Sequence, residues 1–325
     1  MQKQKLKIAS FFTGVGGIDL GFEQTGLCKT IYANEIDESP IKTFELNFDT
    51  KVDMRDISRV KSEEIPSFDI MIAGFPCQAF SIAGLRQGFD DEKGRGTLFF
   101  ELVRILKYHK PKIVFLENVK NLIAHNKGNT FSVILDELNK LGYYVKYSVL
   151  NAKDYGNVPQ NRERIYIVGF LKKDIYEKFS FPDPIPLTKK LSDVIDFETK
   201  LDEKYYYTKG KYKGDIYEKL IEAMDDENAV YQWRRKYARK NKSGVIPTLT
   251  ANQGSGGHNV CLIKTKNGIR KMTPRECFNA QGFPKGFVLP YINDSKLYKQ
   301  AGNSVCVTVI YRIAKNIMIA YYGNT

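Results

Sequence analysis

Residues 6–23 read LKIASFFTGVGGIDLGFE: an apolar run, a glycine-rich turn, and then apolar residues at helical spacing. A short run rich in Ile and Phe that ends at glycines is typical of a buried strand. A strand that turns through glycines into a helix is the opening unit of a doubly wound α/β sheet, and its turn leaves a surface where a ligand can lie. We therefore expect the chain to begin with such a sheet.

The same alternation continues to about residue 170. Apolar runs rich in Ile, Val, Phe and Tyr predict strands that are covered on both faces. These runs span residues 6–12, 29–36, 50–56, 68–75, 112–119, 144–150 and 164–170. Stretches with a helical period lie between them at residues 17–26, 39–48, 97–110 and 131–142. Only residues 151–163 separate the last two strands, which is too short for a crossover helix and predicts an antiparallel return.

The composition changes after Phe181, where FPDPIPLTKK is a linker punctuated by prolines. Farther on, residues 231–242 read YQWRRKYARKNK, with six basic residues, several aromatic residues and no acid. Such a surface suits phosphates and bases, although a solvated helix face has the same composition. We predict a mostly parallel α/β domain with one antiparallel strand, a smaller irregular or β domain, and a hinge. Their expected ranges are 1–185 plus 291–325, 186–272, and 273–290.

Bulk composition narrows the class of protein. The formal net charge of +13 favours a polyanionic partner such as nucleic acid. Five scattered cysteines and three histidines indicate neither a disulfide framework nor a zinc site, so no metal is expected. No apolar run approaches the roughly 18 to 20 residues of a membrane span, so we expect a soluble protein without membrane contact. Residues 298–322 are expected to form a loop and then an amphipathic helix that packs back on the first domain.

Three predicted strand ends carry groups suited to a small ligand. Gly14, Gly16 and Gly17 form the turn after the first strand, although a glycine turn alone is a weak signal that also occurs for structural reasons. Glu35 ends the second strand, where its carboxylate could accept hydrogen bonds from ribose hydroxyls. Asp56 follows the third strand, where it could receive an adenine amino group. The sequence shows no second phosphate-binding element, which favours S-adenosylmethionine over NAD.

The fourth predicted strand runs into GFPCQAFS, residues 74–81, and so places Cys77 at the edge where open α/β sheets bind ligands. A single cysteine is most often a small buried residue, but Pro76 before it and polar residues after it indicate a turn. The stretch that follows, residues 83–96, is long, charged and flanked by glycines, as lids commonly are. This context favours a reactive role for Cys77.

Two more polar sites fall on the same predicted edge. Glu117 and Asn118 end the fifth strand after four apolar residues. Arg162, Glu163 and Arg164 precede the seventh strand, whose start reaches this edge if that strand runs antiparallel. A thiol, a carboxyl and a guanidinium beside a methyl-donor pocket together suggest catalysis.

In this order the motifs resemble those of the DNA cytosine-5 methyltransferases of bacterial restriction–modification systems. The matching segments are FFTGVGGIDLGFE, NEID, GFPCQAFS, ENV, QNRERIYIVGF, RECFNAQGFP and AGNSV, which span residues 8–170 and 273 to the C-terminus. GFPCQAFS with a downstream ENV and QNRER is a highly specific combination. DNA enzymes that methylate amino groups carry an Asp/Ser/Asn-Pro-Pro-aromatic signature where this chain has FPCQ, so methylation of an exocyclic nitrogen is disfavoured.

The resemblance implies methyl transfer to C5 of a cytosine that is flipped out of a DNA duplex. Because C5 is a poor nucleophile, Cys77 would first add to C6 as a thiolate. Glu117 would hold N3 and the exocyclic amino group, and Arg164 would contact O2 with Arg162 as its positioning neighbour. C5 would then take the methyl group of S-adenosylmethionine, leaving S-adenosylhomocysteine, and loss of the C5 proton would expel Cys77.

The resemblance also assigns binding residues. Those for the cofactor are Phe12, Thr13, Gly14, Gly16, Gly17, Glu35, Ile36, Asp56, Ile57, Pro76, Leu98, Asn303 and Ser304. Ile36 stands where many relatives have an aromatic residue against adenine, so that contact is expected to be weaker. The residues assigned to DNA, which would fill the gap in the duplex, read bases or contact phosphate, are Ser81, Arg86, Gln232, Arg234, Arg235, Thr248 and Asn252. The DNA sequence that a relative recognises does not carry over to this chain.

Other functions remain open at this point. A tRNA cytosine-5 methyltransferase has the same fold, but usually with a shorter, less basic middle and a Cys-Phe-Thr tripeptide that this chain lacks. A nucleic-acid-binding protein without catalysis would not need its reactive positions filled, and a nicotinamide-dependent oxidoreductase leaves Cys77 and Glu117 without a role. We expect a monomer in the bacterial cytoplasm, associated with the nucleoid, with double-stranded DNA as partner and a cognate restriction endonuclease encoded nearby.

Overall fold

The chain folds into two compact units, each with its own sheet. A computed structural model describes residues 4–76, 98–212, 214–234, 236–253 and 260–323. The first unit comprises Met1–Leu150, Glu163–Pro182 and Ile310–Thr325, and the second comprises Asn151–Arg162 and Asp183–Val309.

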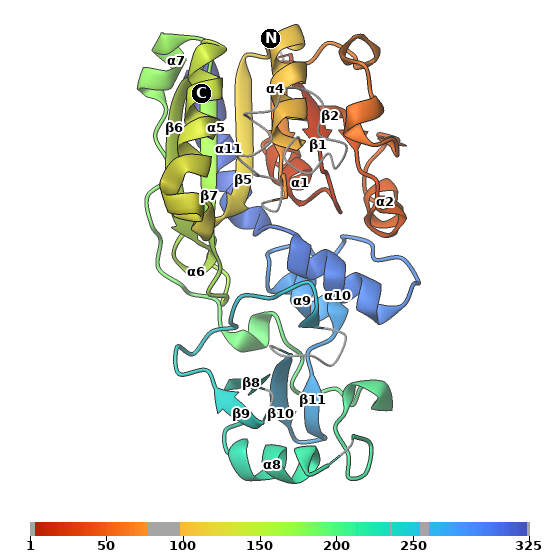
Figure 1. The fold of residues 1–325 in the computed structure, drawn as a ribbon. Helices are drawn as coiled ribbons and strands as arrows, with labels where there is room; N and C mark the ends of the chain where they lie inside the picture. The colour runs from red at the N-terminus through yellow and green to blue at the C-terminus, as the bar shows by residue number, and fades with distance from the viewer. Residues whose placement is uncertain (1–3, 77–97, 213, 235, 254–259, 324–325) are drawn as a thin grey trace. The chain divides into compact units, whose positions relative to one another are not determined.

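The first unit contains a seven-stranded sheet in the order β3-β2-β1-β4-β5-β7-β6 (Figure 1). Its strands are β1 (Leu6–Phe11), β2 (Cys28–Asn34), β3 (Val52–Asp53), β4 (Ile70–Ala73), β5 (Ile113–Val119), β6 (Tyr144–Asn151) and β7 (Glu163–Phe170). The pairs β1–β2, β1–β4, β2–β3 and β4–β5 are parallel, whereas β7 is antiparallel to β5. The predicted fold class, a mostly parallel sheet with an antiparallel strand, is confirmed.

Helices cover both faces of this sheet, which explains the nearly continuous apolar strands. The helices are α1 (Gly17–Glu23), α2 (Glu38–Glu45), α4 (Leu98–His109), α5 (Asn129–Lys140), α7 (Lys173–Lys178) and α11 (Val307–Tyr322). Figure 1 shows α4 and α5 in front of the sheet and α11 behind it. Short 3-10 turns are η1 (Ile57–Arg59), η2 (Ser62–Glu64), η4 (Lys120–Leu122) and η5 (His125–Gly128).

The alternation of side chains along each strand divides the core into two layers. Phe11, Met71 and Leu116 face α4 and α5 in one large apolar cluster. On the other face Phe115 packs edge-on against Phe22 of α1, with ring centroids 5.2 Å apart. The strand ends, and the polar residues that follow them, are therefore held on a rigid, doubly covered sheet.

The C-terminal helix belongs to the first unit, as its sequence predicted. Its residues from Ile310 onward fall in that unit, and the hydroxyl of Tyr322 donates to the carbonyl of Gln4 at 2.7 Å. The stretch Asp294–Tyr322 is long and apolar enough to cross a membrane, but 61% of its most apolar window is buried inside the structure. Ile313 and Ile317 are fully buried, so this stretch supplies a core helix.

The loop expected in this stretch is short. Residues 298–303 form the end of helix α10 (Asp294–Asn303), and residues 304–306 link it to α11. Gly302 disfavours a helix in the sequence, yet a Cβ at this position would lie 2.2 Å from the backbone of Thr250. The close approach of a second backbone therefore requires glycine here, and tertiary packing overrides a helix-propensity cost of about 1 kcal/mol.

The second unit contains a four-stranded sheet in the order β11-β10-β8-β9. Its strands, all antiparallel where they pair, are β8 (Val230–Arg234), β9 (Tyr237–Lys240), β10 (Cys261–Thr265) and β11 (Gly268–Lys271). Its helices and 3-10 turns are α6 (Ala152–Tyr155), η6 (Leu191–Asp193), η7 (Glu203–Tyr205), α8 (Ile216–Ala223), α9 (Pro274–Asn279) and α10. Leu220 of α8 packs with Tyr231 and Leu262 in a small apolar core.

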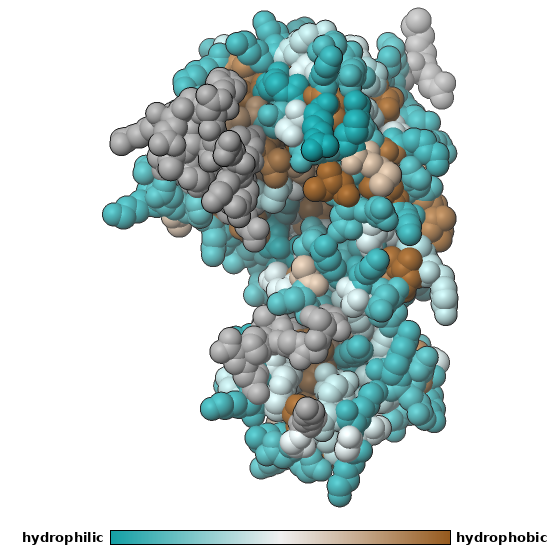
Figure 2. Space-filling model, turned by 45° about the vertical axis from the view of Figure 1, so that its right-hand side comes forward, coloured by the Kyte–Doolittle hydropathy of each residue, from teal (hydrophilic) through white to brown (hydrophobic). Residues whose placement is uncertain are grey.

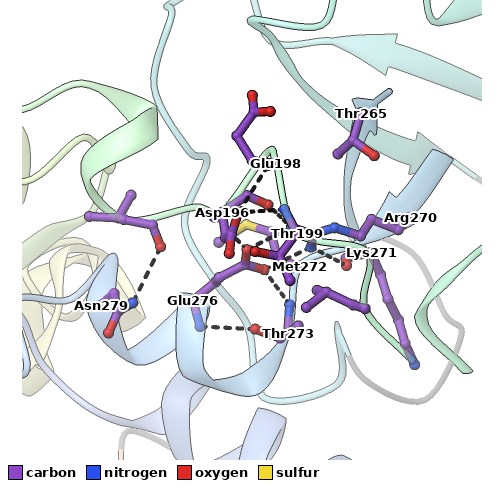
Figure 3. A network of polar contacts seen from close by, with 12 residues as sticks. Asp196, Glu198, Thr199, Thr265, Arg270, Lys271, Met272, Thr273, Glu276 and Asn279 are labelled. Atoms are coloured by element: carbon purple, nitrogen blue, oxygen red, sulfur yellow. Dashed lines mark hydrogen bonds and ion pairs between the residues drawn. The ribbon is translucent and has the colours of Figure 1, made fainter. Parts of the chain in front are cut away.

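A buried ion pair joins β11 to α9 in this unit (Figure 3). Arg270, which is fully buried, donates to both carboxylate oxygens of Glu276 at 2.9 and 2.7 Å. The same carboxylate accepts from the amide of Asp196 at 2.9 Å and from the amide of Thr273 at 2.7 Å. Because every oxygen of the carboxylate has partners, the pair fixes the connection between sheet, helix and the turn at residue 196.

We expect Arg270→Ala to lower the free energy of unfolding by about 3 to 5 kcal/mol, because it leaves the Glu276 carboxylate buried without its counter-charge. Urea denaturation followed by circular dichroism measures this loss. Arg55→Ala is the matched control, since Arg55 pairs with Asp53 and Glu64 on the surface with 49% of its side chain exposed. An equal loss in the two variants would show that the buried pair has no special weight.

The surface view in Figure 2 is mostly hydrophilic with separate hydrophobic patches. Among the large apolar residues that are exposed, Ile36 is 63% and Tyr237 is 56% exposed. Ile36 follows β2 and Tyr237 begins β9, and both residues lie in the sites described below.

Candidate active site

At one position, the backbone of the turn after β1 accommodates only glycine. Gly14 and Gly16 have φ angles of +56° and +81°, and Phe12 also has a positive φ of +53°. A Cβ on Gly16 would lie 2.4 Å from the ring of Phe48. The amide of Gly16 donates to the carbonyl of Thr13 at 2.9 Å and closes the turn, and Gly17 then opens α1. The sequence therefore builds a tight, rigid turn at this strand end.

A buried carboxyl group lies beneath this turn. The hydroxyl oxygens of Thr13, Ser10 and Thr30 lie 2.9, 3.0 and 3.0 Å from the carboxyl oxygens of Asp19. Burial raises the pKa of Asp19 from 3.8 to about 6, while the three hydroxyl groups lower it in part. Asp19 thus ties the turn to both β1 and β2 through hydroxyl groups.

We expect Asp19→Asn to change how stability depends on pH. Because the folded pKa is raised, the folded protein binds more protons than the unfolded chain between about pH 4 and 6, and stability falls as pH rises through this range. A shift of about two pKa units corresponds to about 3 kcal/mol. Melting curves from pH 4 to 7.5 should show this decline in the wild type and a shallower one in Asp19→Asn. Parallel profiles would contradict the assignment.

Glu35 and Ile36 follow β2, and the Glu35 carboxylate contacts the same turn. The Glu35 carboxylate accepts from the amide of Gly14 at 3.0 Å, and from the amides of Ile36 and Asp37 at 2.9 and 3.0 Å. Two carboxylate oxygens offer about four acceptor sites, so a further donor such as a ribose hydroxyl can still be accepted. The exposed Ile36 side chain offers an apolar surface next to this carboxylate.

Asp56 and Ile57 follow β3. The Oδ1 atom of Asp56 accepts from the amide and the hydroxyl of Ser58 at 2.9 and 2.7 Å, and these bonds lower its pKa. The carboxylate is therefore ionised at neutral pH and available as an acceptor. Ile57 is only 2% exposed and packs into the core, so its side chain supports the site from beneath.

A carboxyl and a guanidinium meet at the ends of β5 and β7. The Nε atom of Arg164 lies 3.2 Å from Oε1 of Glu117, and their side chains are 13% and 11% exposed. The register pairs Val119 with Arg164, which is possible because β7 runs antiparallel to β5. The prediction that the two side chains reach one edge of the sheet through an antiparallel strand is confirmed. Their chemical roles stay predictions.

The end of β4 lies against this pair. A Cβ on Gly74 would be 3.6 Å from Oε2 of Glu117, so the end of β4 lies in van der Waals range of this carboxyl. The side-chain amide of Asn118 donates to the carbonyl of Phe75 at 2.8 Å and holds the segment that leads to the exposed Pro76. Cys77 is the next residue in the chain, but it lies outside the described residues, as do Ser81, Arg86 and Arg235.

The remaining four cysteines are buried free thiols. Burial raises the pKa of Cys28 and of Cys261 to about 12, and it raises the pKa values of Cys277 and Cys306 as well. A thiol must ionise and be reached by its substrate to act as a nucleophile. None of these four thiols meets that requirement, which leaves Cys77 as the candidate in this chain.

Arg162 is placed differently from Arg164. It belongs to the second unit, is 2% exposed, and donates to the carbonyls of Leu249, Gly302 and Ser304. Its guanidinium therefore holds the loop at residue 249 against the end of α10. Asn303, at that helix end, is exposed, and Ser304 is 8% exposed. Their contribution to cofactor binding stays a prediction.

The other predicted DNA-binding residues also lie in the second unit. The hydroxyl of Thr248 donates to the carbonyl of Asn161 at 2.7 Å, and Asn252 is exposed and accepts from the hydroxyl of Thr250 at 2.9 Å. Gln232 is 4% exposed, whereas Arg234 is partly exposed. In the described part of the chain, no group of three or more His, Cys, Asp or Glu side chains could hold a metal ion.

Comparison with known proteins shows which family this chain belongs to. A family model described as C-5 cytosine-specific DNA methylase matches residues 6–318. The chain belongs to this family. Among curated relatives, the type II methyltransferase M.Bsp6I of Bacillus sp. (strain RFL6) is 57% identical over 312 residues, which cover 96% of this chain and 98% of the relative. M.SsoII of Shigella sonnei is 40% identical over 97% of this chain and 80% of its own length.

Solved structures agree with this DNA methylase in fold. A DNMT2 variant of Spodoptera frugiperda has a TM-score of 0.74 at 20% identity, covering 97% of this chain and all of the other. The Entamoeba histolytica methyltransferase EhMeth has a TM-score of 0.73 at 21% identity, covering 98% of each chain. At such identities the likeness concerns the fold alone.

Sequence reasoning missed several residues that organise this DNA methylase. Asp19 sits inside a segment recognised for its glycines, and no pattern in that segment marks its carboxyl as buried beneath the turn. Asn118 was noticed beside Glu117 but not given a role. Glu276 lies inside RECFNAQGFP, one of the motifs that carry the family resemblance. Its place in this motif was the one sequence feature that could have pointed to the ion pair with Arg270.

Proposed function

We propose that this DNA methylase transfers a methyl group to C5 of a cytosine flipped out of duplex DNA, with Cys77 as nucleophile. The observation that carries the proposal is the Glu117–Arg164 pair, 3.2 Å apart at the ends of β5 and β7 and beside the end of β4 that leads to Cys77. A carboxyl held by a guanidinium is suited to grip the pyrimidine ring while the thiolate attacks.

The proposed reaction begins with attack of the thiolate on the cytosine ring. The Cys77 thiolate forms a bond to C6, which turns C5 into an enamine carbon, and the negative charge gathers on N3 and O2. Glu117 accepts a hydrogen bond from the exocyclic amino group and shares a proton with N3 as negative charge develops there, and Arg164 offsets charge at O2. S-adenosylmethionine, when bound, supplies the methyl group to C5. Water then takes the C5 proton, the electron pair of the C5–H bond restores the C5–C6 double bond, and Cys77 leaves as thiolate.

The ends of β1, β2 and β3 form the proposed cofactor site. The glycine turn lets the methionine part approach the backbone, Glu35 receives ribose hydroxyls, and Ile36 packs on adenine. Asp56 accepts from the adenine amino group, which its lowered pKa permits at neutral pH. Phe12, Thr13, Gly17, Pro76, Leu98, Asn303 and Ser304 keep the supporting roles assigned by resemblance.

The biological setting is a type II restriction–modification system. The similarity to type II methyltransferases at 57% and 40% identity supports modification of a specific duplex sequence, in a bacterial cytoplasm, that a cognate endonuclease would otherwise cut. We assign catalysis to the domain at 1–185 plus 291–325, target recognition to 186–272 and the hinge to 273–290. The net charge of +13 fits binding to DNA phosphates, and we propose that the protein acts as a monomer.

The test is incubation with methyl-labelled S-adenosylmethionine and either duplex DNA of varied sequence or tRNA, followed by digestion to nucleosides. The proposal expects the label in 5-methyl-2′-deoxycytidine from the duplex. Label in N4-methylcytosine or N6-methyladenine would overturn the chemistry. Label on tRNA and not on DNA would favour the RNA-modifying alternative, and DNA binding without transfer would indicate a protein that has lost catalysis.

A further inference from the structure

The β8–β9 hairpin presents two chemically different faces. Its register pairs Gln232 with Arg239, Trp233 with Ala238, and Arg234 with Tyr237. Because successive side chains of a strand point to opposite faces, Gln232 and Arg239 share one face with Arg234 and Tyr237. Tyr231, Trp233, Ala238 and Lys240 lie on the other face.

The face that carries Tyr231, Trp233, Ala238 and Lys240 is packed against the small apolar core, and its positive charge is paired with carboxylates. Tyr231 is fully buried in the small core, and Trp233 and Ala238 pack against that core. Lys240, at its rim, forms ion pairs with Asp225 at 3.2 Å and with Asp226 at 3.0 Å. The positive charge on this face is therefore offset by the protein itself.

The first face is arranged differently. Gln232 lies between Cys261 on β10, which is 2% exposed, and Arg239 on the edge strand β9, which is exposed. The Oε1 atom of the buried Gln232 amide accepts a hydrogen bond from Nη2 of Arg239 at 2.9 Å. The structure shows no ion pair between Arg239 and any described carboxylate, so a neutral group fixes this guanidinium without offsetting its charge.

We propose that Arg239 reads a guanine in the major groove and that Gln232 is the positioning residue that aims it. The inference deepens the proposed function and rests on it. A two-stranded antiparallel ribbon fits the major groove, and an arginine fork binds O6 and N7 of guanine through two parallel hydrogen bonds. Of the five N–H donors of a guanidinium, one is held by Gln232, and those that remain suffice for the base.

This assignment separates two roles within the basic segment. Gln232 is too buried to reach a base edge itself and acts through Arg239. A fixed arginine loses little side-chain freedom on binding, which favours discrimination between bases over general affinity for phosphate. The exposed Tyr237 on the same face provides contact area beside the fork.

The experiment uses the full-length protein and a duplex that contains its methylation site, mapped beforehand by sequencing DNA that the wild type has modified. Each guanine of the site is replaced in turn by 7-deazaguanine, which keeps base pairing but removes the N7 acceptor. We expect one such replacement to lower kcat/KM of the wild type about 5- to 150-fold. In Arg239→Ala the same replacement should have no further effect, while replacements of other guanines keep theirs.

Three further variants sharpen the result. Arg239→Lys keeps the charge but not the fork and should lose the same discrimination. Gln232→Met keeps the side-chain volume and should weaken discrimination at that guanine with little change at others. Lys240→Ala, which removes a charge from the other face, should keep the wild-type pattern. Circular dichroism and binding of S-adenosylmethionine confirm that each variant is folded.

The outcomes separate the two proposals. A wild type that does not methylate duplex DNA refutes the proposed function. A wild type that methylates its site, with the 7-deazaguanine effect unchanged in Arg239→Ala, overturns the assignment of Arg239 alone. A uniform loss on all sequences, with a shallower dependence on salt, would make Arg239 a phosphate contact and would equally overturn the assignment.

Discussion

The Cys77→Ala variant is expected to lose methyl transfer by at least about 10³-fold, because nothing else in the site can add to C6 and make C5 nucleophilic. The variant should still bind S-adenosylmethionine, since the proposed cofactor contacts come from other residues. Single-turnover methyl transfer to duplex DNA measures the chemical step directly. Equilibrium binding of labelled S-adenosylmethionine measures whether the variant retains its cofactor affinity.

Cys28→Ala is the matched control for this loss. Cys28 is a free thiol whose burial raises its pKa to about 12, so it is protonated and out of reach of a base. Transfer by Cys28→Ala should stay within a few-fold of the wild type. Robust transfer by Cys77→Ala would refute the proposed nucleophile.

The Glu117→Gln variant should show the second large effect, a fall in kcat of about 10²- to 10⁴-fold. Glutamine keeps the size of the side chain but cannot ionise, so it loses its charge interaction with Arg164 and its ability to share a proton with N3. Binding of S-adenosylmethionine should be unchanged. The measurement is steady-state methyl transfer at saturating cofactor and DNA.

Glu163→Gln provides the comparison for this variant. Glu163 begins β7 next to Arg164, but its carboxylate pairs with Lys120 at 3.0 Å and its side chain is 43% exposed. We expect Glu163→Gln to retain most of its activity, because the pair at the surface contributes little. Equal losses in the two variants would indicate a general electrostatic effect and would remove the special role of Glu117.

Much of the fold follows from local sequence. Runs such as IMIA in β4 are apolar at every position because helices cover both faces of the sheet, and all four residues of that strand are buried. The short connection between β6 and β7 excluded a crossover helix, and this alone placed Arg164 on the same edge as Glu117. Strand ends with polar residues thus located the candidate site from the sequence.

The partners of those residues did not follow from sequence, because they join segments that lie far apart in the chain. Arg162 was predicted as a positioning neighbour of Arg164, but the sequence did not show that its guanidinium binds backbone carbonyls at residues 249, 302 and 304. The loop expected before α11 is reduced to residues 304–306, since helix α10 continues through Gly302, which serves a close backbone approach that no local pattern reveals. Such contacts depend on tertiary packing.

Covalent catalysis by Cys77 is tested by trapping the enzyme on duplex DNA that carries 5-fluorocytosine at the target position. After methyl transfer there is no C5 proton to lose, so Cys77 cannot be expelled and its bond to C6 persists. With S-adenosylmethionine present, we expect a protein–DNA complex that survives denaturation and whose cross-linked peptide contains Cys77. Methylation of ordinary sites without any such complex, or a cross-link through another residue, would contradict it.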